Sequence, residues 1–344
     1  MIFNWLEENK LPDFLIRFGI RRLLKVRLDD EDKGTLELQQ NHLNEYIDSL
    51  KKSPVAVNTR DANEQHYEVP TEFYKYVLGK RMKYSGGLWN ANVDSLDTSE
   101  EDMLALSVVR AEIKNGQSVL ELGCGWGSMS LYIAEKFPKC KVIGVSNSKT
   151  QKEYIDAVAK ERGLKNVKII TMDMNVFTIA TKFDRIVSVE MLEHMKNYQA
   201  LFKRISGFLK EDGKFFVHIF THKTFAYPFE VIDESDWMAK YFFTGGMMPS
   251  HDLFLHFQDD ISILKQWTVD GRHYGKTSEA WLKNMDSNRE KILPIFEKTY
   301  GKENTTKWWV YWRVFFMSCA ELWNFDEGQE WIVSHYLFAK KNSG

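Results

Sequence analysis

The sequence predicts an α/β fold in which a mostly parallel, seven-stranded sheet follows N-terminal helices and carries an inserted helical cap. Three observations lead to this prediction. Between residues 116 and 220, short apolar runs alternate with helical segments, which is typical of a parallel sheet with crossover helices. A glycine-rich loop follows the first apolar run. After residue 221 the alternation stops, and only two later runs have the length of a strand.

The composition limits the classes of protein that fit. Of 344 residues, 44% are hydrophobic, and the net charge is only -2, so nucleic acid is not an expected partner. The three cysteines form no Cys-x-x-Cys pair, which argues against disulfides and a metal site. No run approaches the ~20 apolar residues of a membrane span, and residues 1–10 lack the pattern of a signal peptide. We therefore expect a cytoplasmic protein without a metal.

Residues 1–65 form the predicted N-terminal helical segment, with helix in two or three pieces between residues 11 and 55 and a polar loop over 53–67. The helix has an apolar stripe of Leu15, Ile16, Phe18, Ile20, Leu23 and Leu24, flanked by Arg17, Arg21, Arg22, Lys25 and Arg27. Such a helix either docks on its own domain with a solvated basic face or makes peripheral contact with a membrane. We favour docking and expect no stable membrane insertion.

The rest of the chain divides into a core, a cap and a final strand. The core, residues 66–221, has predicted strands at 118–122, 141–146, 167–171, 185–189 and 214–220, helices at 128–136, 149–162 and 198–209, and a turn at Asp212-Gly213. The cap, residues 222–325, holds one core strand at 261–269 and helices near 277–298 and 302–322. Residues 326–344 supply the last strand, 330–339, and a tail. The late helices would then lie in the final hairpin, over the carboxyl edge of the sheet.

The glycine-rich loop indicates a nucleotide-like cofactor. It reads Glu121-Leu-Gly123-Cys124-Gly125-Trp-Gly127 and lies between a strand and a helix. Glycine allows close approach of the backbone to a ligand, and the helix N-terminus offers free N–H groups. The spacing Gly-x-Gly-x-Gly lacks the sixth-position glycine of the dinucleotide fingerprint. We therefore assign Gly123, Cys124 and Gly125 to a different cofactor, S-adenosyl-L-methionine.

Side chains after the neighbouring strands support this assignment. Glu121 can hold the ammonium of the cofactor, and Asp173 can accept a hydrogen bond from the adenine amino group. Asn147 follows the second strand, where a ribose-binding group is expected, and Gln151 lies one turn into the next helix. The expected product is S-adenosyl-L-homocysteine.

A cluster of acids ends the fourth strand. Glu190, Glu193 and His194 lie within five residues, and ligands of open α/β sheets bind beyond the carboxyl ends of strands. An alkyl amine is mostly protonated at neutral pH, with a pKa near ~10 if it resembles lysine. Carboxylates in close proximity raise each other's pKa, and histidine titrates near neutrality. These three residues are therefore the predicted catalytic groups for removing a proton from an amine before methyl transfer.

The chain resembles the coclaurine N-methyltransferase family, which belongs with the cyclopropane fatty acid synthase-like methyltransferases of class I. The resemblance runs from about Tyr67 to Lys340. Its specific stretches are residues 119–152, FDRIVSVEMLEHMKNY at 183–198, 216–229, YFFTGGMMPS at 241–250 and WVYW at 309–312. It implies a Rossmann-like class I methyltransferase fold and an S-adenosylmethionine-dependent N-methyltransferase of alkaloid chemistry.

The resemblance also assigns roles to residues. It implies base chemistry for the Glu190, Glu193 and His194 cluster, and cofactor contact for Tyr84 and Ser85. The implied substrates are cyclic amines on an aromatic skeleton, which an aromatic cap would suit. Residues predicted to face such a substrate are His218, Phe242, Tyr274 and Trp323, with Trp237, Phe243, Trp309 and Trp331 as further aromatic candidates.

One departure from the family concerns Gly86-Gly87, where the family has Cys-Cys or Cys-Ala after the Tyr-Ser pair. In the cyclopropane synthases that first cysteine helps hold a bicarbonate, together with residues resembling Glu193, His218 and Tyr274. Its loss argues against a bicarbonate-assisted lipid reaction, and it suggests a wider pocket.

Three functions follow, of which an N-methyltransferase acting on a small amine leads. The second is a fatty-acyl phospholipid methyltransferase or cyclopropane synthase, and the third is a non-catalytic cofactor-binding module. The sequence leaves open whether the chain forms a homodimer.

Overall fold

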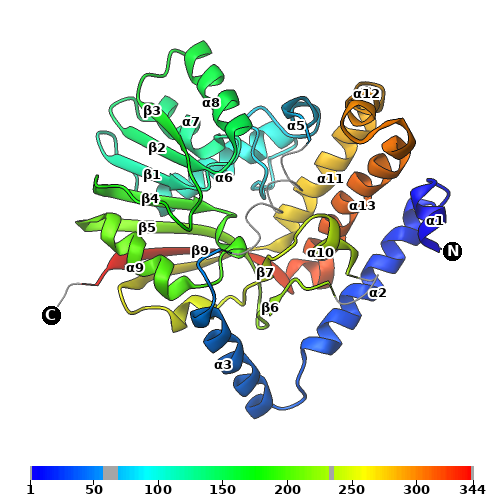
Figure 1. Cartoon of the computed structure of the whole chain (residues 1–344), viewed down its shortest axis with the longest axis horizontal. Coiled ribbons are helices and arrows are strands. Elements are labelled where there is room, and N and C mark those ends of the chain that lie inside the picture. Colours follow the sequence, from blue (N-terminus) through cyan, green and yellow to red (C-terminus); the bar gives the residue numbers. More distant parts are fainter. Residues whose placement is uncertain (1, 57–68, 232–235, 342–344) are drawn as a thin grey trace.

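The computed structural model describes residues 2–56, 69–231 and 236–341, apart from the side chains of residues 2 and 3 (Figure 1). The chain begins with three helices, α1 (Ile2–Glu7), α2 (Asp13–Glu31) and α3 (Leu36–Lys52). α2 and α3 agree with the helical pieces predicted between residues 11 and 55, and α1 lies ahead of that range. Most of the predicted polar loop, residues 57–67, lies outside the described residues. The short helix α5 (Thr71–Val77) follows.

The central sheet has seven strands in the order β3-β2-β1-β4-β5-β9-β8. Their bounds are β1 (Ser118–Leu122), β2 (Lys141–Ser146), β3 (Val167–Thr171), β4 (Phe183–Val189), β5 (Leu209–His222), β8 (Ile261–Val269) and β9 (Trp331–Lys340). β9 runs antiparallel to both β5 and β8, and the other pairs are parallel. This confirms the predicted mostly parallel sheet of the class I methyltransferase type.

Successive residues of a strand point to opposite faces of the sheet. Apolar side chains lie on both faces here, and helices cover both. Val119 packs in a core with the side chains of α6 (Leu96–Arg110) and α7 (Ser128–Lys136). Leu120, the next residue, packs in the core that contains α3 and α9 (Tyr198–Phe208). α8 (Lys149–Glu161) packs through Ile155 against Ile169 of β3.

The predicted turn at Asp212-Gly213 is wrong in one respect, because both residues lie within β5. Phe183 pairs with Leu209, but Arg185 pairs with Lys214, so residues 210–213 form a bulge opposite a single residue of β4. A Cβ at residue 213 would lie 2.9 Å from the carbonyl oxygen of Phe183, which explains why glycine occupies the bulge.

The cap consists of two insertions. The first, between β5 and β8, holds β6 (Tyr227–Pro228), α10 (Trp237–Tyr241), β7 (Met247–Met248) and the short helix η2 (Leu253–His256). The second, between β8 and β9, holds α11 (Gly271–Ser287), α12 (Arg289–Tyr300), η3 (Lys302–Asn304), α13 (Thr305–Asn324) and η4 (Phe325–Gly328). The helix predicted near 277–298 is in fact two helices separated at Asn288. Its first half begins earlier because the Asp270 side chain caps the N–H of Arg272.

The N-terminal helix α2 docks on the cap beside α13 (Figure 1). Arg17 bonds Glu279 at 2.6 and 2.9 Å and Glu321 at 2.9 Å, and Arg21 contacts Glu321 at 2.8 Å. Arg27 also pairs with Asp236, so three of the basic residues predicted to be solvated are held in ion pairs with the cap. Phe14 and Phe18 remain 68% and 61% exposed. No helix in the described ranges is long and apolar enough to cross a membrane.

Candidate active site

The glycine-rich loop connects β1 to α7 through backbone conformations that only glycine adopts easily. Gly123, Gly125 and Gly127 have φ of 76°, 50° and 80°. A Cβ at residue 123 would lie 2.4 Å from Cγ of Met191, so the loop packs directly on the segment after β4. The loop therefore brings the N-terminus of α7 next to the acidic cluster.

A cavity of about 170 Å³ lies over this loop, at the carboxyl ends of β1 to β4. All nine predicted cofactor residues line it: Tyr84, Ser85, Glu121, Gly123, Cys124, Gly125, Asn147, Gln151 and Asp173. Sequence reasoning did not assign Met82, Trp126 and Ser146, which also line it. Burial raises the pKa of Glu121 to about 8, opposed by a hydrogen bond from Ser130. An ammonium group beside this carboxyl would relieve that cost, so the residues fit S-adenosylmethionine.

Glu190 lies where β4 ends, in a left-handed backbone conformation with φ 46° that is costly for a residue with a side chain. Its carboxyl group is fully engaged. The hydroxyl of Tyr274 donates to Oε2 at 2.7 Å, and Nε2 of His218 and the N–H of Gly86 lie 3.2 and 3.4 Å from Oε1. The strained conformation therefore places one carboxylate among three donors.

A buried lysine, which sequence reasoning missed, lies close to this carboxylate. Lys83 is 1% exposed, and its Nζ donates to Ser85 and to the carbonyl of Gly86 at 2.7 Å. Burial lowers its pKa, while the negative charge of Glu190 opposes that change. Burial raises the pKa of Glu190, and Lys83 and Tyr274 oppose the rise. Lys83 thus favours the charged form of Glu190 through its own charge, and its hydrogen bonds hold the predicted cofactor residue Ser85 and the backbone of Gly86.

Glu193 and His194 lie in the single turn η1 (Leu192–His194). Glu193 is 1% exposed, and its Oε2 is buried without a hydrogen-bond partner in the part of the chain that the structure describes. Burial and the nearby negative charge of Glu190 raise its pKa well above the usual range. Burial lowers the pKa of His194 to about 4, so its ring is neutral at pH 7, and it stacks on Phe243 with 6.0 Å between ring centroids. The two neighbours therefore offer a carboxyl group with a raised pKa and a neutral imidazole.

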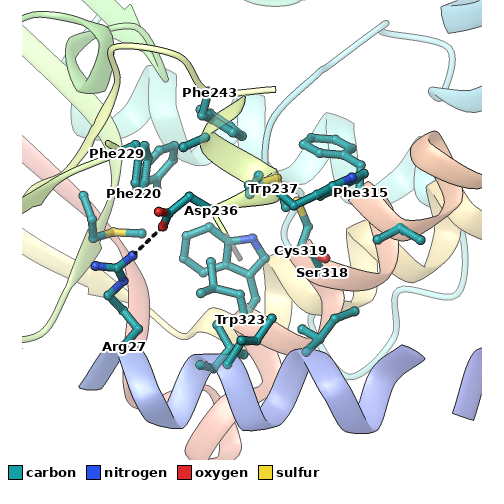
Figure 2. Close-up of a pocket in the computed structure, with 18 of the residues that line it drawn as sticks. Arg27, Phe220, Phe229, Asp236, Trp237, Phe243, Phe315, Ser318, Cys319 and Trp323 are labelled. Atoms are coloured by element: carbon teal, nitrogen blue, oxygen red, sulfur yellow. Dashed lines mark hydrogen bonds and ion pairs between the residues drawn. The ribbon is translucent and has the colours of Figure 1, made fainter. Parts of the chain in front are cut away.

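A second, larger cavity of about 590 Å³ adjoins the first, and Tyr84, Glu190 and His194 line both. The second cavity is walled by aromatic and aliphatic side chains from the cap and α2 (Figure 2). Its labelled aromatic residues are Phe220, Phe229, Trp237, Phe243, Phe315 and Trp323. Figure 2 also shows Arg27 reaching from α2 to Asp236, with Nη2 and Oδ1 3.3 Å apart. An apolar molecule bound here would thus place one end beside Glu193, His194 and the cofactor cavity.

Comparison with known proteins identifies this arrangement. The family model described as mycolic acid cyclopropane synthetase matches residues 56–329. The chain belongs to this family. The chain is 42% identical to (S)-coclaurine N-methyltransferase of Papaver somniferum, over 98% of this chain and 97% of that protein. It is 38% identical to pavine N-methyltransferase of Thalictrum flavum subsp. glaucum, over 98% and 95% of the two chains.

A solved structure gives the same result. The crystal structure of coclaurine N-methyltransferase bound to N-methylheliamine and SAH matches with a TM-score of 0.95 at 39% identity, covering 98% of this chain and 99% of that one. The predictions of the family, of a methyltransferase and of its cofactor are confirmed: this member of the cyclopropane synthetase family is an S-adenosylmethionine-dependent N-methyltransferase.

The predicted substrate residues of this family member divide into two groups. Tyr274 and Trp323 line the larger cavity, and their rings stack with centroids 4.7 Å apart. His218 does not line it, because the ring is buried behind Glu190. Phe242 does not line it either: its ring is fully buried and stacks on Phe315 at 4.5 Å, so Phe243 faces the cavity instead. Phe242 is therefore corrected from a wall residue to a core residue.

The other aromatic candidates divide in the same way. Trp237 lines the cavity, whereas Trp309 and Trp331 do not. Sequence reasoning also missed α2 as a wall, although Ile16, Ile20 and Leu24 of the predicted apolar stripe face the cavity. The apolar stripe predicts that one face of α2 is buried, but the surface that this face covers is determined by how α2 packs on α13.

Gly86 and Gly87 do not widen the cavity, contrary to the expectation from sequence. A Cβ at residue 86 would lie 3.1 Å from Cγ of Tyr274, and one at residue 87 would lie 2.5 Å from Oγ of Ser99. The space that a larger residue would take is therefore filled by neighbours. In particular, Gly86 lets the ring of Tyr274 approach closely enough to bond Glu190.

Among the described residues no group of three or more His, Cys, Asp or Glu side chains is arranged to hold a metal ion. Cys124 and Cys140 are buried, Cys319 is partly buried, and all three are free thiols.

Proposed function

We propose that this N-methyltransferase acts on a small cyclic amine with an aromatic skeleton, of the tetrahydroisoquinoline or benzylisoquinoline type. One observation carries the proposal. The unpartnered, buried carboxyl oxygen of Glu193 belongs to a residue that lines the aromatic cavity, directly before His194, which lines both this cavity and the cofactor cavity. The relatives named for coclaurine and pavine, and the solved structure with bound N-methylheliamine, support this class of amine.

The residues divide the work of holding the amine and removing its proton. An aromatic wall that includes Trp323 and Phe243 binds the flat skeleton and favours its cation. Glu193 accepts the proton from the ammonium form, because burial and Glu190 raise the pKa of its carboxyl group and make it a better base than an ordinary carboxylate. His194, neutral and stacked on Phe243, orients the nitrogen. S-adenosylmethionine supplies the methyl group: the bond from carbon to sulfur breaks as the bond from carbon to nitrogen forms.

Glu190 has a different role in this proposal. Its oxygens are occupied by Tyr274, His218 and Gly86, so it is poorly placed to take a proton from the substrate. Its fixed negative charge instead favours a cation at the junction of the cavities, where the amine and the sulfonium would meet. The Glu190, Glu193 and His194 cluster thus combines one anionic anchor, one base and one orienting imidazole.

The geometry disfavours the lipid reaction. By the resemblance drawn from sequence, counterparts of His218 and Tyr274 help hold a bicarbonate in cyclopropane synthases. Here both side chains contact the carboxylate of Glu190. A second anion at that position would be repelled by Glu190 and would lack these donors.

The test is a substrate screen with the full-length protein and S-adenosylmethionine. Tetrahydroisoquinolines, phenethylamines, simple alkylamines and vesicles of unsaturated phospholipid are incubated in parallel, and products are measured by mass spectrometry. We expect a mass increase of one methyl group on cyclic aromatic amines. Methylation of the phospholipid acyl chains without any amine product would overturn the proposal.

A further inference from the structure

A chain of hydrogen bonds leads from Glu190 through two histidines to an arginine that the proposed reaction does not use. Oε1 of Glu190 lies 3.2 Å from Nε2 of His218. Nδ1 of His218 lies 2.8 Å from Nε2 of His335, and Nδ1 of His335 lies 2.7 Å from Nη1 of Arg110. The two histidines are direct partners on β5 and β9, and both are fully buried. Arg110 is the last residue of α6 and lies with its guanidinium over Trp267.

The arginine dictates which nitrogen of each histidine carries the proton. Burial and the positive charges of Lys83 and Arg110 hold the pKa of both histidines well below the usual range, so each ring is neutral and has one N–H. Arginine only donates hydrogen bonds. Nδ1 of His335 must therefore accept, which leaves its Nε2–H to donate to His218. The same reasoning makes Nδ1 of His218 an acceptor and directs its Nε2–H at Glu190.

This arrangement opposes a proton on Oε1 of Glu190. A protonated Oε1 would need to donate to Nε2 of His218, which would reverse both histidines. The N–H at Nδ1 of His335 would then meet an N–H of Arg110, and no hydrogen bond could form. Oε2 is not restricted in this way, because the hydroxyl of Tyr274 can rotate and become an acceptor.

We propose that Arg110 is a positioning residue of the methyl-transfer site, which fixes the tautomers of His335 and His218 and thereby keeps Glu190 a carboxylate. The expected effect on kinetics rests on the proposed function, whereas the expected tautomers of His218 and His335 do not depend on it. The inference separates the two acids of the motif: the histidine chain favours the anionic form of Glu190, whereas Glu193 has no such partner and is left to exchange a proton.

The other titratable groups around Glu190 do not replace this control. Those that face it or interact with its charge are Lys83 before α6, Glu193 and His194 of η1, Tyr274 of α11 and Cys319 of α13. Lys83 stabilises the anion through its charge, but it donates to Ser85 and Gly86 and does not contact His218. Among the described residues named here, only Arg110 bonds the far end of the histidine chain. Because an arginine only donates, it determines which nitrogen of each histidine carries the proton.

The first experiment needs only the unaltered protein. Histidine is labelled with ¹⁵N, and the ring nitrogens of His218 and His335 are assigned from the spectra of His218→Gln and His335→Gln. We expect both rings to be neutral Nε2–H tautomers between pH 6 and 9. An Nδ1–H tautomer at either residue would overturn the inference, whatever the substrate of the enzyme.

The second experiment uses variants of the arginine. Arg110→Met removes the donor, and we expect an Nδ1–H population at both histidines. Arg110→Lys keeps a group that only donates, and it should retain the original tautomers. If the methionine variant does not fold, Arg110→Gln serves, since its amide oxygen can accept from His335 and lets the chain reverse. Unchanged tautomers in the methionine or glutamine variant would overturn the inference.

The kinetic readout is the pH profile of kcat/KM for a methylated amine from the screen. In Arg110→Met the histidines can reverse and accept a hydrogen bond from a protonated Oε1 of Glu190. Glu190 should therefore lose its negative charge at higher pH, and the acid limb should move upward by about one pH unit. The dissociation constant for S-adenosylmethionine should stay within about twofold, since Arg110 does not line the cofactor cavity.

Arg185→Met is the matched control for both readouts. Arg185 is buried and ends its hydrogen bonds on the carbonyls of Glu112 and Asp184, away from the histidines. We expect it to change neither the tautomers nor the acid limb. The same shift in Arg185→Met and Arg110→Met would show a general structural effect and would refute the positioning role.

Discussion

The cofactor cavity and the substrate cavity meet at Glu190 and His194 but are built in opposite ways. The cofactor cavity draws most of its lining from short segments directly after β1 to β4. The substrate cavity draws its lining from α2, the first cap insertion, α11 and α13, which lie more than 300 residues apart in sequence at the extremes. The cofactor cavity can therefore be predicted from local motifs, whereas the substrate cavity forms only when helices that are distant in sequence pack together.

Glu193→Gln should have the largest effect, and it tests the junction of the two cavities. The amide cannot accept a proton, so we expect kcat to fall by about 10² to 10⁴. The dissociation constant for S-adenosylmethionine, measured by calorimetry, should change little. Glu230→Gln is the matched control, because Glu230 lines the same cavity but is exposed, and it should stay within about threefold. A glutamine variant with normal turnover would remove Glu193 as the base.

The pH dependence of the unaltered enzyme should show a displaced acid limb. A protonated Glu193 cannot accept the proton, and its pKa is raised by burial and by Glu190, so activity is lost as pH falls through a value well above the ordinary ~4.3 of glutamic acid. We expect kcat/KM to drop about tenfold per pH unit below that limb. Two amines of different pKa separate protein from substrate, because a limb that belongs to the protein stays in place. A limb near pH 4 would contradict the assignment.

Glu121→Gln should act on the cofactor side alone. Replacing a buried carboxylate that faces an ammonium should weaken binding of S-adenosylmethionine about 10- to 100-fold. Ser130→Ala is the control: it removes only the hydroxyl that bonds Glu121, so a smaller loss is expected. The KM for the amine should not change in either variant. Equal cofactor affinity in Glu121→Gln and the parent would show that the carboxyl does not hold the ammonium.

The two cavities show what the sequence could and could not predict. The parallel sheet, the bounds of β1, β2 and β3, and residues that line the cofactor cavity, such as Glu121 and Asp173, followed from local pattern, because motifs at strand ends are fixed by the strands themselves. Phe242 and Phe243 could not be told apart from sequence. Both are aromatic neighbours in an irregular segment, and which of them is core depends on where Phe315 of α13 lies. Lys83 was missed because no periodicity marks a buried lysine in a loop.

The pair Phe242 and Phe243 therefore gives a direct test of the substrate wall. Phe243→Ala removes a ring from the cavity, and we expect KM for the amine to rise about two- to tenfold. Phe242→Ala removes a fully buried ring and should cost about 3 to 5 kcal/mol of stability, seen as a lower Tm, with little change in KM. The two variants are each other's control. A higher KM in Phe242→Ala than in Phe243→Ala would reverse the correction made from the structure.

The smallest expected effect concerns the docking of α2, which only the substrate cavity needs. Arg17 ties α2 to Glu279 and Glu321 with a side chain that is 21% exposed, so Arg17→Gln should loosen one wall. Ion pairs of this kind contribute about 0.2 to 1 kcal/mol, which corresponds to a rise in KM of at most about fivefold with kcat unchanged. Arg22→Gln, an exposed position on the same helix, should leave KM unchanged. Cofactor affinity should be the same in both variants, because α2 does not line the cofactor cavity. A change in cofactor affinity with Arg17→Gln would mean that the two cavities are coupled through the cap. Loosening α2 would then alter the cofactor cavity as well, although the two cavities are built from separate parts of the sequence.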